Sequence, residues 1–90
     1  MIVKSAILFY SLAHPYDPII ISGERHADCY EKLFKQRIPY HKSSVIEGFL
    51  TEKHAFLDRY DAKYEAMRCH QLDTYGENRA LYSEDIWPEE

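Results

Sequence analysis

Short apolar runs separated by polar turns dominate the beginning of the chain. Val3–Leu12 is rich in β-branched and aromatic residues and predicts a first strand, and Ile19–Ser22 predicts a short second strand that ends at Gly23. The segment that begins at His14 contains two prolines within four residues. Because prolines cannot continue a strand ladder, this segment predicts a turn. Together, the three segments predict a β-hairpin.

The hydrophobic spacing then changes to that of a helix. Within Glu24–Arg37 apolar residues recur every three or four positions, which is the period of one helix face. These residues are Ala27, Tyr30, Leu33 and Phe34. Ile38–Ser44 predicts a loop, and Val45–Thr51 with Ala55–Leu57 predicts a second hairpin around the polar turn Glu52–His54.

A second helix is predicted over Asp58–Leu72. Asp58 is a favourable N-cap, because its side-chain oxygen can accept a hydrogen bond from a free N–H group in the first turn. Asp61 follows three residues later and suits the positive end of the helix dipole. The junction between hairpin and helix is therefore well marked in the sequence.

The remaining residues predict a loop over Asp73–Arg79, a last short strand over Ala80–Tyr82, and a terminal turn that is capped by Ser83 and reaches Trp87. The order of elements predicts an α+β fold, in which two short β-hairpins form a mostly antiparallel sheet packed on two α-helices. We expect residues 1–90 to form a single domain.

Composition limits the classes of partner. The chain has 90 residues, with 15 acidic against 11 basic ones, a net charge of −4 and no basic run, so we expect no binding to the backbone of DNA or RNA. The eight tyrosines, four phenylalanines and one tryptophan are a heavy aromatic load for a small domain, which favours homo-oligomerisation. The apolar N-terminus is too short to span a bilayer, so we expect no membrane partner.

The residues that could perform chemistry are scattered. Cys29 and Cys69 are 40 positions apart, which predicts two free thiols in a reducing cytosol. The histidines fall on different predicted elements, so no metal site is expected. Cys69 and His70 are adjacent in a predicted helix and point about 100° apart, which excludes a nucleophile–base pair. Without a catalytic group or a nucleotide-binding glycine motif, we expect neither enzymatic activity nor a cofactor.

Two arginines lie where helices are predicted to begin. Arg25 follows a strand and Arg59 follows Asp58, and an arginine at such a position can bind a phosphate through two parallel hydrogen bonds. Phe49 and Phe56 could supply a stacking face for a base. In the alternative interpretation, the phenylalanines are core residues and the arginines are surface charges that pair with Glu24 or Asp61.

Three segments together resemble a known family. They are Gly23-Glu-Arg-His-Ala-Asp after a strand, Gly48-Phe-Leu-Thr followed by Phe56-Leu-Asp-Arg, and Leu81-Tyr-Ser-Glu-Asp-Ile-Trp. In this order they are similar to small phage and prophage proteins that include the sponge-type Thoeris anti-defence family, the first kind described. The resemblance extends from Ile19 to Trp87, with gaps in the linkers.

The resemblance implies a homodimer, or an assembly of dimers, that holds a cyclic ADP-ribose isomer in pockets between subunits without cleaving it. Some members also bind cyclic di- or trinucleotides at separate sites. The resemblance matches Arg25, Phe49, Asp58 and Arg59 to positions of the family motifs. We expect these four residues to bind the ligand, together with His26, Thr51 and Phe56. Two positions depart from the family pattern: Glu24 replaces a common basic residue, and His54 stands where a turn glycine is usual.

We therefore expect a phage anti-defence protein that sequesters a cyclic nucleotide immune signal, either a cyclic ADP-ribose isomer or a cyclic oligonucleotide, in the host bacterial cytoplasm. The alternative is a phage inhibitor that binds a host protein directly through an aromatic surface. A small nucleotide hydrolase is the third hypothesis.

Overall fold

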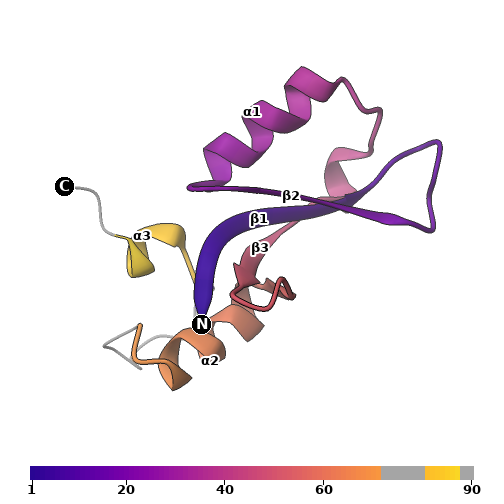
Figure 1. The fold of residues 1–90 in the computed structure, drawn as a ribbon. Helices are drawn as coiled ribbons and strands as arrows, with labels where there is room; N and C mark the ends of the chain where they lie inside the picture. The colour runs from indigo at the N-terminus through magenta and orange to yellow at the C-terminus, as the bar shows by residue number, and fades with distance from the viewer. Residues whose placement is uncertain (72–80, 88–90) are drawn as a thin grey trace.

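A four-stranded antiparallel sheet forms the centre of the computed structural model, which describes residues 1–71 and 81–87 (Figure 1). Its strands are β1 (Ile2–Tyr10), β2 (Pro18–Gly23), β3 (Ile46–Thr51) and β4 (Phe56–Asp58), in the spatial order β2-β1-β3-β4. All three pairings are antiparallel. The two predicted hairpins therefore form one sheet, because β1 of the first hairpin pairs with β3 of the second.

Two helices pack on this sheet. Helix α1 (His26–Gln36) lies along β1 and β2, as Figure 1 shows, and α2 (Arg59–Arg68) packs against β3, β4 and β1. A 3₁₀ turn (Lys42–Ser44) precedes β3, and the short helix α3 (Ser83–Ile86) follows Leu81. The predicted α+β class, the antiparallel sheet and its two helices are confirmed.

Both main helices cover the same face of the sheet. Phe49 and Ser5 are partners in the β1–β3 ladder, so their side chains share a face. Ile7, which lies on the same face as Ser5, packs with Cys29 of α1, while Phe49 packs with Ala62 of α2. The core consequently lies on one side of the sheet.

The core on that side has two parts. The first holds α2 and the C-terminal segment around Phe49, and it contains Ile2, Ala62, Ala66 and Leu81. The second lies under α1 and contains Ile7, Phe9, Ile21, Cys29 and Leu33. The start of α1 links them, because the His26 ring packs edge-on against Phe49, with 5.2 Å between ring centroids.

Several predicted boundaries are wrong. Helix α1 begins at His26, not Glu24, and α2 ends at Arg68, not Leu72, because His70 adopts a left-handed backbone conformation with φ 58°. Leu81 and Tyr82 are not in a strand, and Tyr82, not Ser83, is the N-cap of α3. The predicted loop Asp73–Arg79 and the predicted strand residue Ala80 lie outside the described residues.

The turn between β3 and β4 places a histidine, His54, in a backbone conformation that usually needs glycine. His54 adopts a left-handed conformation with φ 63°, a region that glycine usually fills. The Thr51 hydroxyl accepts hydrogen bonds from the backbone N–H groups of Lys53 and Ala55, at 3.3 and 3.2 Å. These bonds order the turn, so the positive φ at His54 is accommodated there.

Candidate functional site

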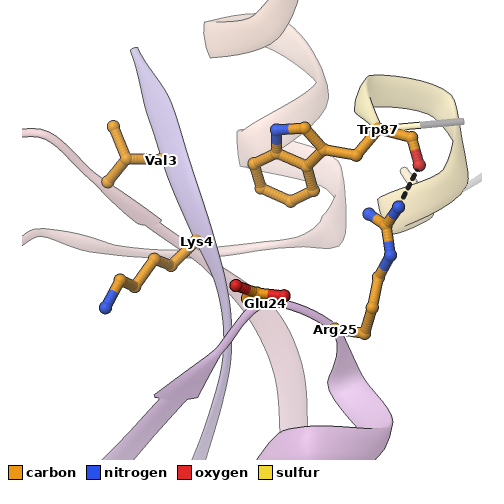
Figure 2. Close-up of a pocket in the computed structure, with 5 residues that line it drawn as sticks. All are labelled: Val3, Lys4, Glu24, Arg25 and Trp87. Carbon is orange, nitrogen blue, oxygen red and sulfur yellow. Dashed lines mark hydrogen bonds between the residues drawn. The ribbon is translucent and has the colours of Figure 1, made fainter.

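A pocket of about 430 Å³ opens between the start of β1, the β2–α1 turn and the C-terminal segment. Its lining is formed by Val3, Lys4, Glu24, Arg25 and Trp87 (Figure 2). The set combines two cations, one carboxylate, one indole and one aliphatic side chain. Among the predicted site residues, only Arg25 lines this pocket.

Arg25 connects the β2–α1 turn to the C-terminal segment. Its guanidinium donates hydrogen bonds to the backbone carbonyls of Ser83, at 3.4 Å, and Trp87, and lies 5.6 Å from the Trp87 ring centroid. Its backbone N–H donates to the Asp28 carboxylate at 3.0 Å, which fixes the start of α1. Arg25 thereby holds Trp87 at the pocket. Its contacts with the described residues use only two of its five guanidinium N–H groups, so the others can donate to a ligand.

The charges of the pocket are close together but not fully paired. In Figure 2, the Glu24 carboxylate lies between Lys4 and Arg25, while the Lys4 ammonium points away from Trp87. Lys4 and Glu24 are both exposed. Among the described residues that line the pocket, two are cations and one is an anion, in a chain whose net charge is −4. These side chains favour an anionic ligand.

Trp87 belongs to both the pocket and the core. It is half-buried and packs against the cluster around Phe49, with 6.4 Å between the two ring centroids. Because one side of the indole is anchored, it can offer a fixed aromatic surface to a planar ligand.

Arg59 occupies a different environment. It forms an ion pair with Glu47 on β3, its guanidinium lies 4.7 Å from the Tyr82 ring centroid, and its carbonyl accepts a hydrogen bond from Leu81 N–H at 3.2 Å. Its Nε is buried and bonds to none of the described side chains or backbone groups. The alternative pairing of Arg59 with Asp61 is wrong, because Glu47 takes this role.

The other predicted site residues have structural contacts. Phe49 is completely buried, so in this conformation it cannot stack on a ligand. His26 Nε2 lies 2.8 Å from the Gly48 carbonyl, Thr51 orders the hairpin turn, and Phe56 is half-buried beside Gly48. Asp58 caps α2, as predicted, by accepting hydrogen bonds from the N–H groups of Tyr60 and Asp61 at 3.0 and 2.8 Å.

Sequence reasoning missed Val3 and Lys4 as site residues. It noted Glu24 only as a departure from the family pattern. It placed Trp87 in the C-terminal motif but predicted no contact for it. Lys4 gave a detectable signal, since it is a charged residue that interrupts an otherwise apolar predicted strand. The sequence gave no signal that Lys4 lies close to Trp87, because only folding brings the N-terminal strand and the C-terminal segment together.

Two side chains in the α1 half of the core, Cys29 and the partly buried Tyr30, have raised pKa values. Burial raises the pKa of the Cys29 thiol to about 11, which keeps it protonated and unreactive at neutral pH. Burial and a hydrogen bond to Glu47 raise the pKa of Tyr30 to about 12. Both cysteines are free, as predicted. Neither Cys29 nor Tyr30 lines the pocket at Trp87.

The described residues contain neither a cluster of metal ligands nor a membrane-spanning helix. No group of three or more histidine, cysteine, aspartate or glutamate side chains within residues 1–71 and 81–87 could hold a metal ion. No helix in the same ranges is long and apolar enough to cross a membrane.

The fold and pocket define a small α+β protein with a sheet covered by helices on one face and a charged, aromatic pocket at the chain ends. The chain belongs to the phage T4 y16D protein family, whose model matches residues 1–87. This match supports a small phage protein but does not single out the Thoeris sponge family. No curated protein and no solved structure gave a significant match.

Proposed function

We propose that this phage protein binds and sequesters a cyclic nucleotide immune signal, a cyclic ADP-ribose isomer or a cyclic oligonucleotide, in the cytoplasm of the host bacterium. The observation that carries the proposal is the pocket lined by Trp87, Arg25, Lys4 and Glu24. Assembly as a homodimer, or as several dimers, is part of the same proposal.

The size and chemistry of the pocket suit such a ligand. Ligand pockets commonly enclose about 300–1,000 Å³, and this one has about 430 Å³. A base can stack on the indole of Trp87, which contributes about 1–3 kcal/mol in comparable sites. Arg25 and Lys4 attract phosphate, and Glu24 can accept hydrogen bonds from the amino group of a base.

Sequestration requires affinity but no turnover, so the proposal needs no catalytic group. A Kd of about 10 nM corresponds to about −11 kcal/mol. One stacked base and two charge-assisted phosphate contacts supply a large part of this free energy. The ligand is therefore expected to leave the protein chemically unchanged.

Mass spectrometry of the bound molecule tests this function. The purified protein is mixed with a panel of cyclic ADP-ribose isomers and cyclic di- and trinucleotides, passed over a desalting column and denatured by heat. We expect one panel member to be recovered intact at a stoichiometry near one per pocket. Recovery of an altered nucleotide would instead identify a hydrolase, and recovery of none would contradict nucleotide binding.

A second candidate function is direct binding to a host protein. It is favoured by Tyr60 and Tyr64, which lie one turn apart on α2 and are 61% and 70% exposed. Exposed tyrosines are enriched at protein interfaces because the ring is apolar and its tip is polar. Tyr60→Ala combined with Tyr64→Ala would abolish host-protein capture under this hypothesis and would leave nucleotide binding unchanged.

A further inference from the structure

Glu24 supplies the carboxylate of the pocket at Trp87. It is the one acidic side chain among the described residues that line this pocket. Figure 2 shows the carboxylate between Lys4 and Arg25, below the Trp87 ring in that view, and without a hydrogen bond to any of the lining residues drawn. A carboxylate accepts hydrogen bonds through two neighbouring oxygens and donates none. Both oxygens are therefore available to a ligand that stacks on the indole.

The backbone at Glu24 is fixed by β1 and by the start of α1. The buried hydroxyl of Ser5 donates a hydrogen bond to the Glu24 carbonyl at 3.3 Å. The turn is tight at Gly23, where an added Cβ atom would lie 2.9 Å from the Cβ atom of Asp28. The next residue is held as well, because the Arg25 backbone N–H donates to the Asp28 carboxylate. The Glu24 side chain consequently extends into the pocket from a defined position.

The bases of nucleotides differ in the donors that they can offer to a carboxylate. The Watson–Crick edge of guanine carries two neighbouring donors, N1–H and the N2 amino group, which can bond both oxygens at once. Adenine and cytosine each carry one donor beside an acceptor, and uracil carries one donor between two acceptors. An acceptor that faces a carboxylate oxygen is repelled. A carboxylate therefore pairs bidentately with guanine and with no other of these bases.

We infer that the pocket at Trp87 selects a guanine base and that Glu24 is the residue that selects it. The inference rests on the proposed function and narrows its ligand to a guanine-containing cyclic oligonucleotide, because a cyclic ADP-ribose isomer carries adenine. Trp87 stacks on the base while Glu24 accepts hydrogen bonds from its edge. The Lys4 ammonium points away from Trp87 in Figure 2, so a phosphate that it binds lies at the far end from the ring.

Isothermal titration calorimetry with cyclic di-GMP, cyclic di-AMP and cyclic di-IMP tests this inference. The three probes share their phosphates and differ at the base edge, and the hypoxanthine of cyclic di-IMP is guanine without its N2 amino group. We expect wild-type protein to bind cyclic di-GMP about tenfold more tightly than either of the other probes, since a matched bidentate pair gives discrimination of this order.

Glu24→Gln separates base selection from charge. The glutamine amide offers one acceptor and one donor, which match the edges of adenine and hypoxanthine better than that of guanine. Loss of the negative charge strengthens phosphate binding of all three probes, so the ratio of affinities is the readout. The preference for cyclic di-GMP over each of the other probes should fall about tenfold. The matched control Glu31→Gln removes an exposed carboxylate on α1 that does not line the pocket and should leave both ratios unchanged.

Circular dichroism verifies that each variant is folded. Equal affinity of the wild type for cyclic di-GMP and cyclic di-AMP would overturn the inference, as would unchanged ratios in Glu24→Gln or an equal change in Glu31→Gln. Each of these results would leave nucleotide sequestration standing, as would binding of a cyclic ADP-ribose isomer in place of all three probes. Binding of no cyclic nucleotide at all would contradict both the guanine preference and the proposed function.

Discussion

At the residue scale, the two arginines named from the sequence hold different parts of one C-terminal segment. Arg25 binds the carbonyls at Ser83 and Trp87, and Arg59 contacts Leu81 and Tyr82. An arginine is well suited to this role, because its planar group can donate several hydrogen bonds and stack on a ring at the same time. Arg25 adds a cation to the pocket, whereas Arg59 is a structural tie between β3, α2 and Tyr82.

We therefore expect Arg59→Ala to lower the free energy of unfolding by about 1–2 kcal/mol, because it removes a half-buried ion pair and a cation–π contact. Chemical denaturation measures this loss. The control Lys35→Ala removes an exposed pair with Glu31 and should change stability by less than about 0.5 kcal/mol. An Arg59→Ala protein as stable as the wild type would show that Arg59 is a free surface charge.

The sequence identified important single residues more reliably than it identified their roles. Asp58 as an N-cap could be predicted because a cap acts within its own turn. The burial of Phe49 and the pairing of Arg59 with Glu47 could not, because both depend on the packing of β3 against α2. Interactions within one turn of a helix can be predicted from neighbouring residues, but contacts between residues distant in the sequence cannot.

At the element scale, α2 depends on its first turn. The helix has only ten residues, and its buried contacts come from Ala62 and Ala66, which contribute little apolar area. The two N–H groups that Asp58 satisfies are therefore a large part of what holds this helix in place. The same reasoning explains why the predicted end at Leu72 was wrong, since nothing in the spacing of apolar residues reveals the left-handed conformation of His70.

We expect Asp58→Ala to destabilise the protein by about 1 kcal/mol, the usual effect of losing an N-cap side chain. Asp58→Asn should restore most of the loss, because the amide oxygen can accept the same hydrogen bonds. Asp61→Ala, at an exposed position in the same turn, is the matched control and should have a smaller effect. Equal losses for Asp58→Ala and Asp61→Ala in thermal unfolding would argue against the cap.

At the scale of the whole molecule, the N-terminal strand brings distant segments together. β1 lies between β2 and β3, and its residues Val3 and Lys4 line the pocket together with Trp87. The amino group of Met1, directly before β1, pairs with Glu65 on α2. The fold class could be predicted, since local periodicity defines the elements. The pocket could not, because it is assembled from residues more than 60 positions apart.

The ion pairs of Glu65 make stability depend on pH. Hydrogen bonds from Arg68 and the N-terminal amino group lower the pKa of Glu65 from its usual 4.5 to about 2. Since the unfolded chain binds this proton more tightly, the contribution is complete above pH 4.5 and is lost as the pH falls toward 2. We expect the denaturant concentration at the unfolding midpoint to decrease as the pH falls from 4.5 toward 2. Glu65→Gln should make this decrease with pH less steep. Identical pH profiles for Glu65→Gln and the wild type would contradict the assignment.

The central claim is that the pocket at Trp87 binds a nucleotide, and the fluorescence of this residue tests it most directly. Trp87 is the single tryptophan of the chain, so its emission reports on the pocket without interference. Titration with the nucleotide recovered from the panel should quench the wild-type emission to saturation. Lys4→Ala should weaken binding about tenfold, and Lys35→Ala, which removes the same charge from α1, should not. Unchanged emission on nucleotide binding, or equal affinity of Lys4→Ala and wild type, would contradict the claim.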